Sequence, residues 1–240
     1  MSLSTSHKVV VIGGTSGLGL ATAQAVAAKG AAVVVASRNP AGVDAALREL
    51  PPTATGHAVD ASDPVAVAAF LDAVGPFDHL VYTAGENFAA TTLDGYTAEA
   101  GARFLGLRLV HMLDVVRQAV PYLREGGTIT LTAGTAAFKG GPGWFLGAAV
   151  SGAVVAAVRS LAVELAPLRV NAVAPGVVRS PLWAGMPEAD RELMYEVTGK
   201  SLPLGRVGEP EDVAREYVHL IEQDYATGVV SVVDGGTVLV

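Results

Sequence analysis

The chain contains no cysteine, which excludes disulfide bonds, thiolate catalysis and every metal site built on cysteine. Charged residues are scarce, at 16% of 240 residues, and the net charge of −7 comes without any basic stripe. Nucleic acid and an anionic membrane are therefore not expected as partners. Residues 1–7 are expected to be too short and polar for a signal peptide, and no apolar run is expected to reach membrane-spanning length. These absences predict a cytoplasmic protein, and no spacing of side chains predicts a metal site.

Apolar residues are abundant, at 51% of the chain, and they occur in runs that alternate between strand-like and helix-like patterns. Strands are predicted at residues 8–12, 32–36, 56–59, 79–83, 128–132, 168–173 and 229–233. Helices are predicted at residues 18–29, 41–50, 64–74, 97–123, 144–165 and 209–222, with Asp63 as the N-cap of the third and Pro64 as its first residue. This alternation predicts one α/β domain over residues 1–240, with a doubly wound (Rossmann-type) parallel sheet of seven strands and helices on both faces. Residues 1–7 are expected to be a flexible leader, and residues 175–208 an irregular loop beside the substrate and cofactor.

The first strand ends in glycines at Gly13, Gly17 and Gly19, and a helical run follows. Such a turn leaves the first N–H groups of the helix unpaired, and glycines let a pyrophosphate approach the backbone closely. The spacing is G-x-x-x-G-x-G instead of the common dinucleotide spacing G-x-G-x-x-G. The stretch therefore predicts nucleotide binding, with a merely structural turn as the alternative.

Several motifs together resemble the short-chain dehydrogenase/reductase family, and they cover nearly the whole chain. They are the Gly13/Gly17/Gly19 turn, Asp60 after the third strand, Ala84-Gly85 after the fourth, the run Arg-Val-Asn-Ala-Val-Ala-Pro-Gly at residues 169–176, and Val-Asp-Gly-Gly at residues 233–236. The resemblance implies an oxidoreductase that uses a nicotinamide cofactor on a small-molecule substrate. It also implies a homodimer or homotetramer in which the two long helices pair across the subunit interface.

The resemblance also implies where the cofactor would bind. The predicted cofactor-binding residues are Gly13, Thr15, Ser16, Gly17, Leu18, Gly19, Ser37, Arg38, Asn39, Asp60, Ala61, Ala84, Gly85, Pro175, Gly176, Val178 and Ser180. At the end of the second strand, Ser37 and Arg38 stand where NAD-selective sites commonly carry a carboxylate. A hydroxyl and a guanidinium suit a 2′-phosphate, so NADP(H) is the predicted cofactor; the alternative is that Arg38 is a solvated loop charge.

The family's catalytic groups are an asparagine, a serine and a Tyr-x-x-x-Lys pair, and here all four are replaced. When the chain is aligned with the family's motifs, Arg108 stands at the position of the asparagine and Gly134 at that of the serine. Gly147 stands at the position of the tyrosine and Ser151 at that of the lysine. No Tyr-x-x-x-Lys occurs anywhere in the chain, so a small register slip cannot restore the pair. Tyrosine normally supplies the proton that the reduced oxygen needs, and neither glycine nor serine can replace it near neutral pH.

Four residues are candidates for a replacement role, and their catalytic part is left open. Arg108 could stabilise an oxyanion or a substrate carboxylate, or it could form a structural ion pair with Glu86. Thr132 and Thr135 could offer hydroxyls, or they could be occupied within the turn. Tyr82, at the end of a central strand, is interpreted as packing.

Three hypotheses about function remain. The favoured one is an NADPH-dependent oxidoreductase with an atypical site, acting on a quinone or an activated dicarbonyl whose reduced oxygen is easily protonated. The alternative is a non-catalytic NADPH-binding sensor or structural module. A weaker third reading is a lyase or isomerase reaction in the same pocket.

Overall fold

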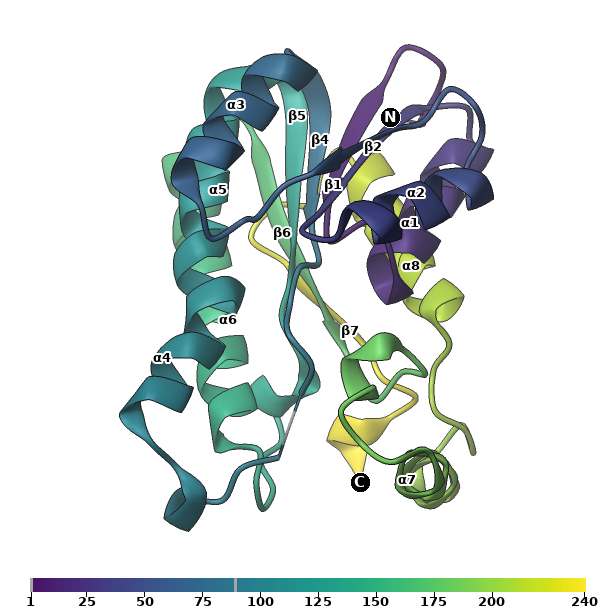
Figure 1. Cartoon of the computed structure of the whole chain (residues 1–240), viewed down its shortest axis with the longest axis vertical. Coiled ribbons are helices and arrows are strands. Elements are labelled where there is room, and N and C mark those ends of the chain that lie inside the picture. The colour runs from purple at the N-terminus through teal and green to yellow at the C-terminus, as the bar shows by residue number, and fades with distance from the viewer. Residues whose placement is uncertain (1, 89) are drawn as a thin grey trace.

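A computed structural model describes residues 2–88 and 90–240, which form one parallel sheet covered by helices (Figure 1). Its seven strands lie in the order β3-β2-β1-β4-β5-β6-β7. The strands are β1 (Lys8–Ile12), β2 (Ala32–Ser37), β3 (Thr55–Ala58), β4 (Phe77–Tyr82), β5 (Leu123–Thr132), β6 (Arg169–Pro175) and β7 (Val230–Val233). The predicted fold class, a doubly wound seven-stranded sheet, is confirmed.

Eight α-helices are present in the described residues, and the two faces of the sheet share most of them. They are α1 (Gly17–Ala28), α2 (Pro40–Glu49), α3 (Pro64–Val74), α4 (Ala98–Leu105), α5 (His111–Ala119), α6 (Phe145–Glu164), α7 (Glu188–Ser201) and α8 (Pro210–Glu222). Residues of α3, α5 and α6 pack on one face, and residues of α1 and α8 pack on the other. Figure 1 shows these two groups on opposite sides of the strands, with α2 beside α1.

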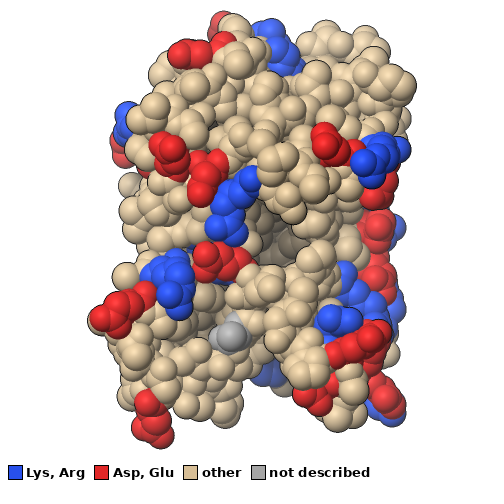
Figure 2. Space-filling model, in the orientation of Figure 1, with Lys and Arg blue, Asp and Glu red and all other residues tan. Residues whose placement is uncertain are grey.

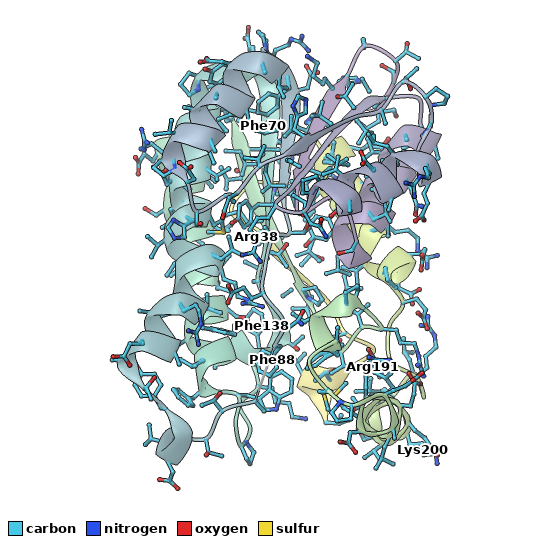
Figure 3. The ribbon with its side chains drawn as sticks, in the orientation of Figure 1. Arg38, Phe70, Phe88, Phe138, Arg191 and Lys200 are labelled. Carbon is cyan, nitrogen blue, oxygen red and sulfur yellow. The ribbon has the colours of Figure 1, made fainter. Side chains whose placement is uncertain are left out.

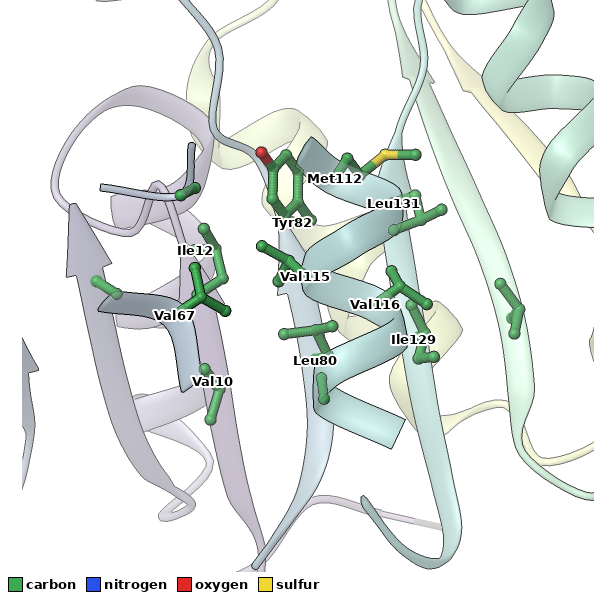
Figure 4. Packing of buried hydrophobic residues seen from close by; sticks show 14 of the residues in the cluster. Val10, Ile12, Val67, Leu80, Tyr82, Met112, Val115, Val116, Ile129 and Leu131 are labelled. Atoms are coloured by element: carbon green, nitrogen blue, oxygen red, sulfur yellow. The ribbon is translucent and has the colours of Figure 1, made fainter. Parts of the chain in front are cut away.

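Alternate residues of each central strand enter the two cores because successive side chains point to opposite faces. In β1, Val10 and Ile12 join the cluster beneath α3 and α5, whereas Val9 and Val11 join the cluster beneath α1 and α8. Figure 4 shows the first cluster, in which these β1 side chains lie beside neighbouring strands and Val67. A parallel sheet buried on both faces explains the near-continuous apolar runs of the sequence.

The predicted helix at residues 97–123 is divided in the structure. Between α4 and α5 the turn Gly106–Val110 is π-helical, and the following segment ends in the 3₁₀ turn Val120–Tyr122. The strand β5 begins at Leu123, five residues earlier than predicted. Single π-turns occur mostly inside α-helices and frequently at functional sites, and this one carries Arg108.

Two predictions about irregular segments are wrong. Residues 175–208 are not wholly irregular, because they contain the fourteen-residue helix α7. The leader is not a loose tail in its described part: Leu3 is buried in the core beneath α1, and its N–H donates to the Glu222 carboxylate at 3.0 Å. Leu3 thus holds the described part of the leader against the domain.

The helix α6 corrects the expectation that no apolar run reaches membrane-spanning length. Its twenty residues have a mean hydropathy of 1.8 over the most apolar window, enough by length and composition alone. Buried α6 residues such as Val154 and Val158 pack in the same cluster as the central strands. The apolar residues on the sheet-facing side of α6 therefore pack against the strands.

The strand order reverses between β1 and β4, since β1 continues to β2 on one side and β4 continues to β5 on the other. In such sheets a crevice opens beyond the carboxyl ends of the strands at this point, and ligands bind there. The β1–α1 turn and the segment after β4 both lie at this crevice, because Thr83 N donates to Ile12 O at 2.8 Å.

Asn171 in β6 holds the edge of the sheet and is fully buried. Its Nδ2 donates to Ala226 O at 2.8 Å, and its Oδ1 accepts from Val229 N at 3.0 Å. We expect Asn171→Ala to lower the free energy of unfolding by about 2–3 kcal/mol, because both partners lose a buried hydrogen bond. Urea unfolding measures this loss, and exposed Asp44→Asn is the control, expected to change stability by less than about 0.5 kcal/mol. Equal midpoints for the two variants would contradict this structural role.

Candidate functional site

A cavity of about 550 Å³ lies beyond the carboxyl ends of the central strands. Figure 2 shows it as a hollow near the middle of one face of the molecule. Its wall comes from the β1–α1 turn, the segments that follow each of the strands β2 to β7, the helices α4, α6 and α7, and the π-turn after α4. All of these segments except the helices are loops at one edge of the sheet, where the topology places ligands.

The glycine turn packs against the end of β4 with no room for side chains. A Cβ on Gly19 would lie 2.2 Å from Gly13 O, and one on Gly13 would lie 2.6 Å from Ala84 N. Gly13 also adopts φ +84°, a conformation that favours glycine. The turn therefore requires glycine at both positions, and it directs the start of α1 toward the cavity.

The N-terminus of α1 retains the features of an anion site. Ser16 precedes the helix in an extended conformation without a capping hydrogen bond from its side chain, and the first turn contains no acidic residue. The first N–H groups of the helix are thus available, and the helix dipole favours a negative charge beside them. This cradle of open N–H groups fits a pyrophosphate.

The predicted cofactor residues converge on this cavity, with two exceptions. Those on its wall are Gly13, Thr15, Ser16, Gly17, Leu18, Gly19, Ser37, Arg38, Ala61, Ala84, Gly85, Pro175, Gly176, Val178 and Ser180. Asn39 and Asp60 are absent from the wall as the structure describes it.

Asn39 instead caps α2, accepting a hydrogen bond from Ala41 N at 3.1 Å. The Asp60 carboxylate accepts from the Ser62 hydroxyl at 2.7 Å and from Ser62 N at 2.9 Å. These bonds hold the pKa of Asp60 below its ordinary value. Both side chains have local partners that the linear spacing did not reveal.

The four positions that correspond to the family's catalytic groups also meet in the cavity. Arg108, Gly134, Gly147 and Ser151 all line it. A Cβ on Gly134 would lie 3.0 Å from the Ser151 hydroxyl, so these two positions are neighbours. The structure thus brings together the four positions that the sequence register selected, and none of them carries an acid suited to neutral pH.

The space beside Gly147 is filled by an aromatic side chain from another part of the chain. Phe88, in the loop after β4, lies so close that a Cβ on Gly147 would be 3.3 Å from its ring. The Phe88 ring stacks on Trp144 at a centroid distance of 4.8 Å and meets Trp183 edge-on at 5.6 Å. Figure 3 shows Phe88 near the middle of the view, below Arg38. An apolar aromatic wall therefore stands where the resemblance implies a tyrosine acid.

Arg108 points into the site and is largely buried. Its Nη2 donates to the backbone carbonyl of Glu86, and its guanidinium lies 4.4 Å from the Phe104 ring centroid. Its Nη1 is buried and has no hydrogen-bond partner among the described residues. Burial lowers the pKa of Arg108, which the Glu86 carboxylate opposes, but a guanidinium remains charged at any physiological pH.

The other three candidates, Thr132, Thr135 and Glu86, differ in whether their side chains are available in the cavity. The Thr132 hydroxyl donates to Tyr82 O at 2.6 Å and therefore accepts from the Tyr217 hydroxyl, so its proton is already used. Thr135 lines the cavity, where its catalytic role stays a prediction. Glu86 reaches the site through its backbone carbonyl, and its side chain is not part of the described cavity wall.

Tyr82 and Tyr217 cannot replace the missing acid. The Tyr82 hydroxyl donates to Leu107 O at 2.8 Å, and Tyr217 is fully buried against Thr132. Burial raises the pKa of both phenols well above the ordinary value. Both remain protonated and packed, which agrees with the interpretation of Tyr82 as a packing residue.

The chain is similar to known proteins over nearly its whole length. The family model described as enoyl-(acyl carrier protein) reductase matches residues 13–238. Short-chain dehydrogenase/reductase ATR9 of Stachybotrys chlorohalonatus is 35% identical over 97% of this chain and 97% of its own. A small-chain dehydrogenase solved in complex with NADPH is 34% identical, with a TM-score of 0.87 over 98% of this chain and 99% of that one.

A further solved structure is a short chain oxidoreductase from Pseudomonas aeruginosa PAO1 with NADPH bound. It is described as containing an atypical catalytic center. It is 30% identical to this chain, with a TM-score of 0.89 over 99% of this chain and 98% of that one.

The close packing of the glycine turn is testable with one substitution made at two positions. We expect Gly19→Ala to cost about 3 kcal/mol or more, because its methyl group would overlap the backbone oxygen of Gly13. Gly42→Ala in α2 is the control: its added Cβ would lie 3.7 Å from the nearest side-chain atoms, an ordinary contact, so helix propensity predicts a gain of up to about 1 kcal/mol. Urea unfolding of both variants checks this, and a Gly19→Ala protein as stable as Gly42→Ala would contradict the close packing of the turn.

Proposed function

Because this chain belongs to the short-chain dehydrogenase/reductase family, we propose that it is an NADPH-dependent oxidoreductase that reduces activated carbonyl compounds without a tyrosine acid. The observation that carries this proposal is the cavity itself. A nucleotide cradle and a buried, partly unpaired Arg108 line the same space, while Gly147 and Ser151 occupy the positions of the acid pair.

The residues present fit the cofactor. The glycine turn and the open N–H groups at the start of α1 suit the pyrophosphate, and Ser37 with Arg38 suits a 2′-phosphate at the end of β2. Pro175, Gly176 and Val178 line the cavity in the segment that holds the nicotinamide carboxamide in the family. NADPH supplies a hydride when it is bound. The NADPH-bound relatives support this assignment.

The protein's own residues determine which substrates can react. Reduction of a simple ketone produces a strongly basic alkoxide, which needs a proton donor beside it. The site offers none at Gly147 or Ser151, and burial raises the pKa of the Tyr82 and Tyr217 phenols well above the ordinary value. A reduced quinone or activated dicarbonyl carries a weakly basic oxygen, which the Arg108 cation can stabilise until water protonates it. Activated carbonyls are therefore the proposed substrates.

A non-catalytic NADPH-binding module is the second candidate, and the loss of all four catalytic groups favours it. Two observations favour the enzyme. The carboxamide segment reaches the cavity, where a pure binding module has less need to orient a nicotinamide. The relative from Pseudomonas aeruginosa combines bound NADPH with an atypical catalytic center and is described as an oxidoreductase.

We also propose that the protein is a cytoplasmic homodimer or homotetramer. The helix α6 is rich in small residues, which let helices approach closely, and it exposes Val163 with 80% of its surface accessible. Val110, next to α5, is also exposed. A second copy of these helices would cover both side chains.

We expect NADPH to bind about ten- to hundredfold more tightly than NADH, because Arg38 can form charge-assisted hydrogen bonds with the 2′-phosphate. Arg38→Ala should abolish this preference and leave NADH binding nearly unchanged. Isothermal titration calorimetry measures both affinities, and Arg48→Ala, an exposed cation of α2, is the matched control. Equal affinities of the unmodified protein for the two cofactors would reject the assignment of NADP.

Turnover should separate activated from simple carbonyls. We expect measurable NADPH oxidation with 2-methyl-1,4-naphthoquinone and little or none with acetophenone. Arg108→Met should lower kcat/KM for the quinone by about a hundredfold, the typical cost of removing an oxyanion-stabilising donor. Arg103→Met, an exposed cation in the last turn of α4, controls for charge.

Stopped-flow absorbance of NADPH reports both substrates. Rapid reduction of acetophenone would overturn the argument from the missing acid. Tight NADPH binding without turnover of any activated carbonyl would favour the binding module.

A further inference from the structure

The wall of the cavity is cationic although the chain is acidic. Three of its side chains, Arg38, Arg108 and Lys139, carry a positive charge. No aspartate, glutamate or histidine belongs to the wall as described, even though the whole chain carries a net charge of −7. A cleft lined by one sign of charge concentrates ligands of the opposite sign. Under the proposed function the 2′-phosphate accounts for Arg38, which leaves Arg108 and Lys139 to be explained.

Arg108 is the inner of these cations and retains an unused donor. Its Nη2 is held by the Glu86 carbonyl, while its Nη1 is buried without a hydrogen-bond partner in the described chain. A buried charged donor without a partner is unfavourable, so a ligand that supplies an acceptor oxygen there is bound more tightly. The planar guanidinium suits a carboxylate or another delocalised oxyanion.

Lys139 is the outer cation, in the loop between β5 and α6, and it is exposed. Its Nζ donates to the backbone carbonyl of Thr237 and to an oxygen of Val240, the last residue of the sequence. Thr237 and Val240 also line the cavity. Lys139 is thus held against the C-terminal segment, and the buried Nη1 of Arg108 is left as the donor for an anion.

The remaining wall on this side is aromatic. Phe88, Trp144 and Trp183 form a compact group, in which the two indoles lie 6.0 Å apart between ring centroids. Phe88 and Trp183 are each less than 9% exposed, and Trp183 Nε1 is fixed by a hydrogen bond to Val178 O at 2.9 Å. Rings held in this way offer a rigid apolar surface on which another ring can stack.

The aromatic wall and the inner cation adjoin. Phe104 contacts both, because its ring lies under the Arg108 guanidinium and 6.0 Å from the Phe88 ring. We propose that the substrate of this site is a planar aromatic anion, whose ring stacks on the aromatic wall and whose negatively charged oxygen binds Arg108. The proposal rests on the proposed function for the place of the cofactor, but it concerns recognition and not turnover. An aryl carboxylate and an ionised hydroxyquinone share this chemistry.

Equilibrium binding to the NADP⁺-saturated protein tests the proposal without any reaction. The carboxylate pair of probes is 2-naphthoate and its neutral counterpart 2-naphthamide. The quinone pair is 2-hydroxy-1,4-naphthoquinone, which is ionised at neutral pH, and 2-methoxy-1,4-naphthoquinone. Decalin-2-carboxylate keeps the charge and size but lacks the aromatic ring. Calorimetry gives the affinities, and the fluorescence of Trp144 and Trp183, the only two tryptophans of the chain, reports binding at the aromatic wall.

We expect the ionised member of at least one pair to bind at least tenfold more tightly than its neutral counterpart, and at least tenfold more tightly than decalin-2-carboxylate. The pair that shows this preference identifies the source of the anion. Arg108→Met should remove the charge preference, and Arg108→Lys, which keeps the charge but loses the planar fork, should retain part of it. Arg103→Met should leave it intact. Thermal unfolding confirms that each variant is folded.

Equal affinity within both pairs would show that the site does not select an anion. Equal affinity for decalin-2-carboxylate would show that it does not select an aromatic ring. Failure of every probe to bind would overturn the whole proposal. Failure of the proposed function has a different signature. In that case NADPH is not oxidised by quinones, while the charge preference and its dependence on Arg108 persist.

Discussion

The start of α1 can face the crevice only because the β1–α1 turn lies directly against the end of β4. This approach leaves no space for a Cβ on Gly13 or Gly19, whose added atoms would fall within 2.6 Å of backbone. The same contact places Ala84 and the segment after it beside the helix terminus. Both the cradle of N–H groups and the loop that carries Phe88 therefore depend on this backbone-to-backbone packing. A methyl group at Gly19 would separate them.

The loss of the family's acid pair is coupled to the packing of a distant loop. Gly147 leaves an open position on α6, and Phe88 fills it from the segment after β4. Phe88 in turn supports Trp144 and Trp183, so the glycine and the aromatic wall form one arrangement. A tyrosine at residue 147 would need the space that the Phe88 ring now takes. Glycine at residue 147 is thus part of the packing of the site, and Arg108 is the charged residue among the four replaced catalytic positions.

Local regularities of the chain were sufficient to predict most of the fold. Apolar runs indicated the seven strands of the sheet. Asp63 followed by Pro64 correctly indicated the start of α3, where the carboxylate accepts from Val65 N at 2.9 Å. The helix α7 was missed because its residues are mostly polar and only Tyr195 and Gly199 are buried. The π-turn at residues 106–110 was missed because one extra residue in a helical turn leaves no mark on composition.

For the site, the sequence determined which positions meet through its resemblance to the family: the register that this resemblance implies selects Arg108, Gly134, Gly147 and Ser151, and all four line one cavity. Regular elements make this possible because each residue advances by a known rise and rotation. Only the tertiary structure decided that Phe88 fills the tyrosine position, since that contact depends on how separate loops close over the sheet. No periodicity in a sequence records contacts between loops, because they arise from packing and not from the local geometry of the backbone.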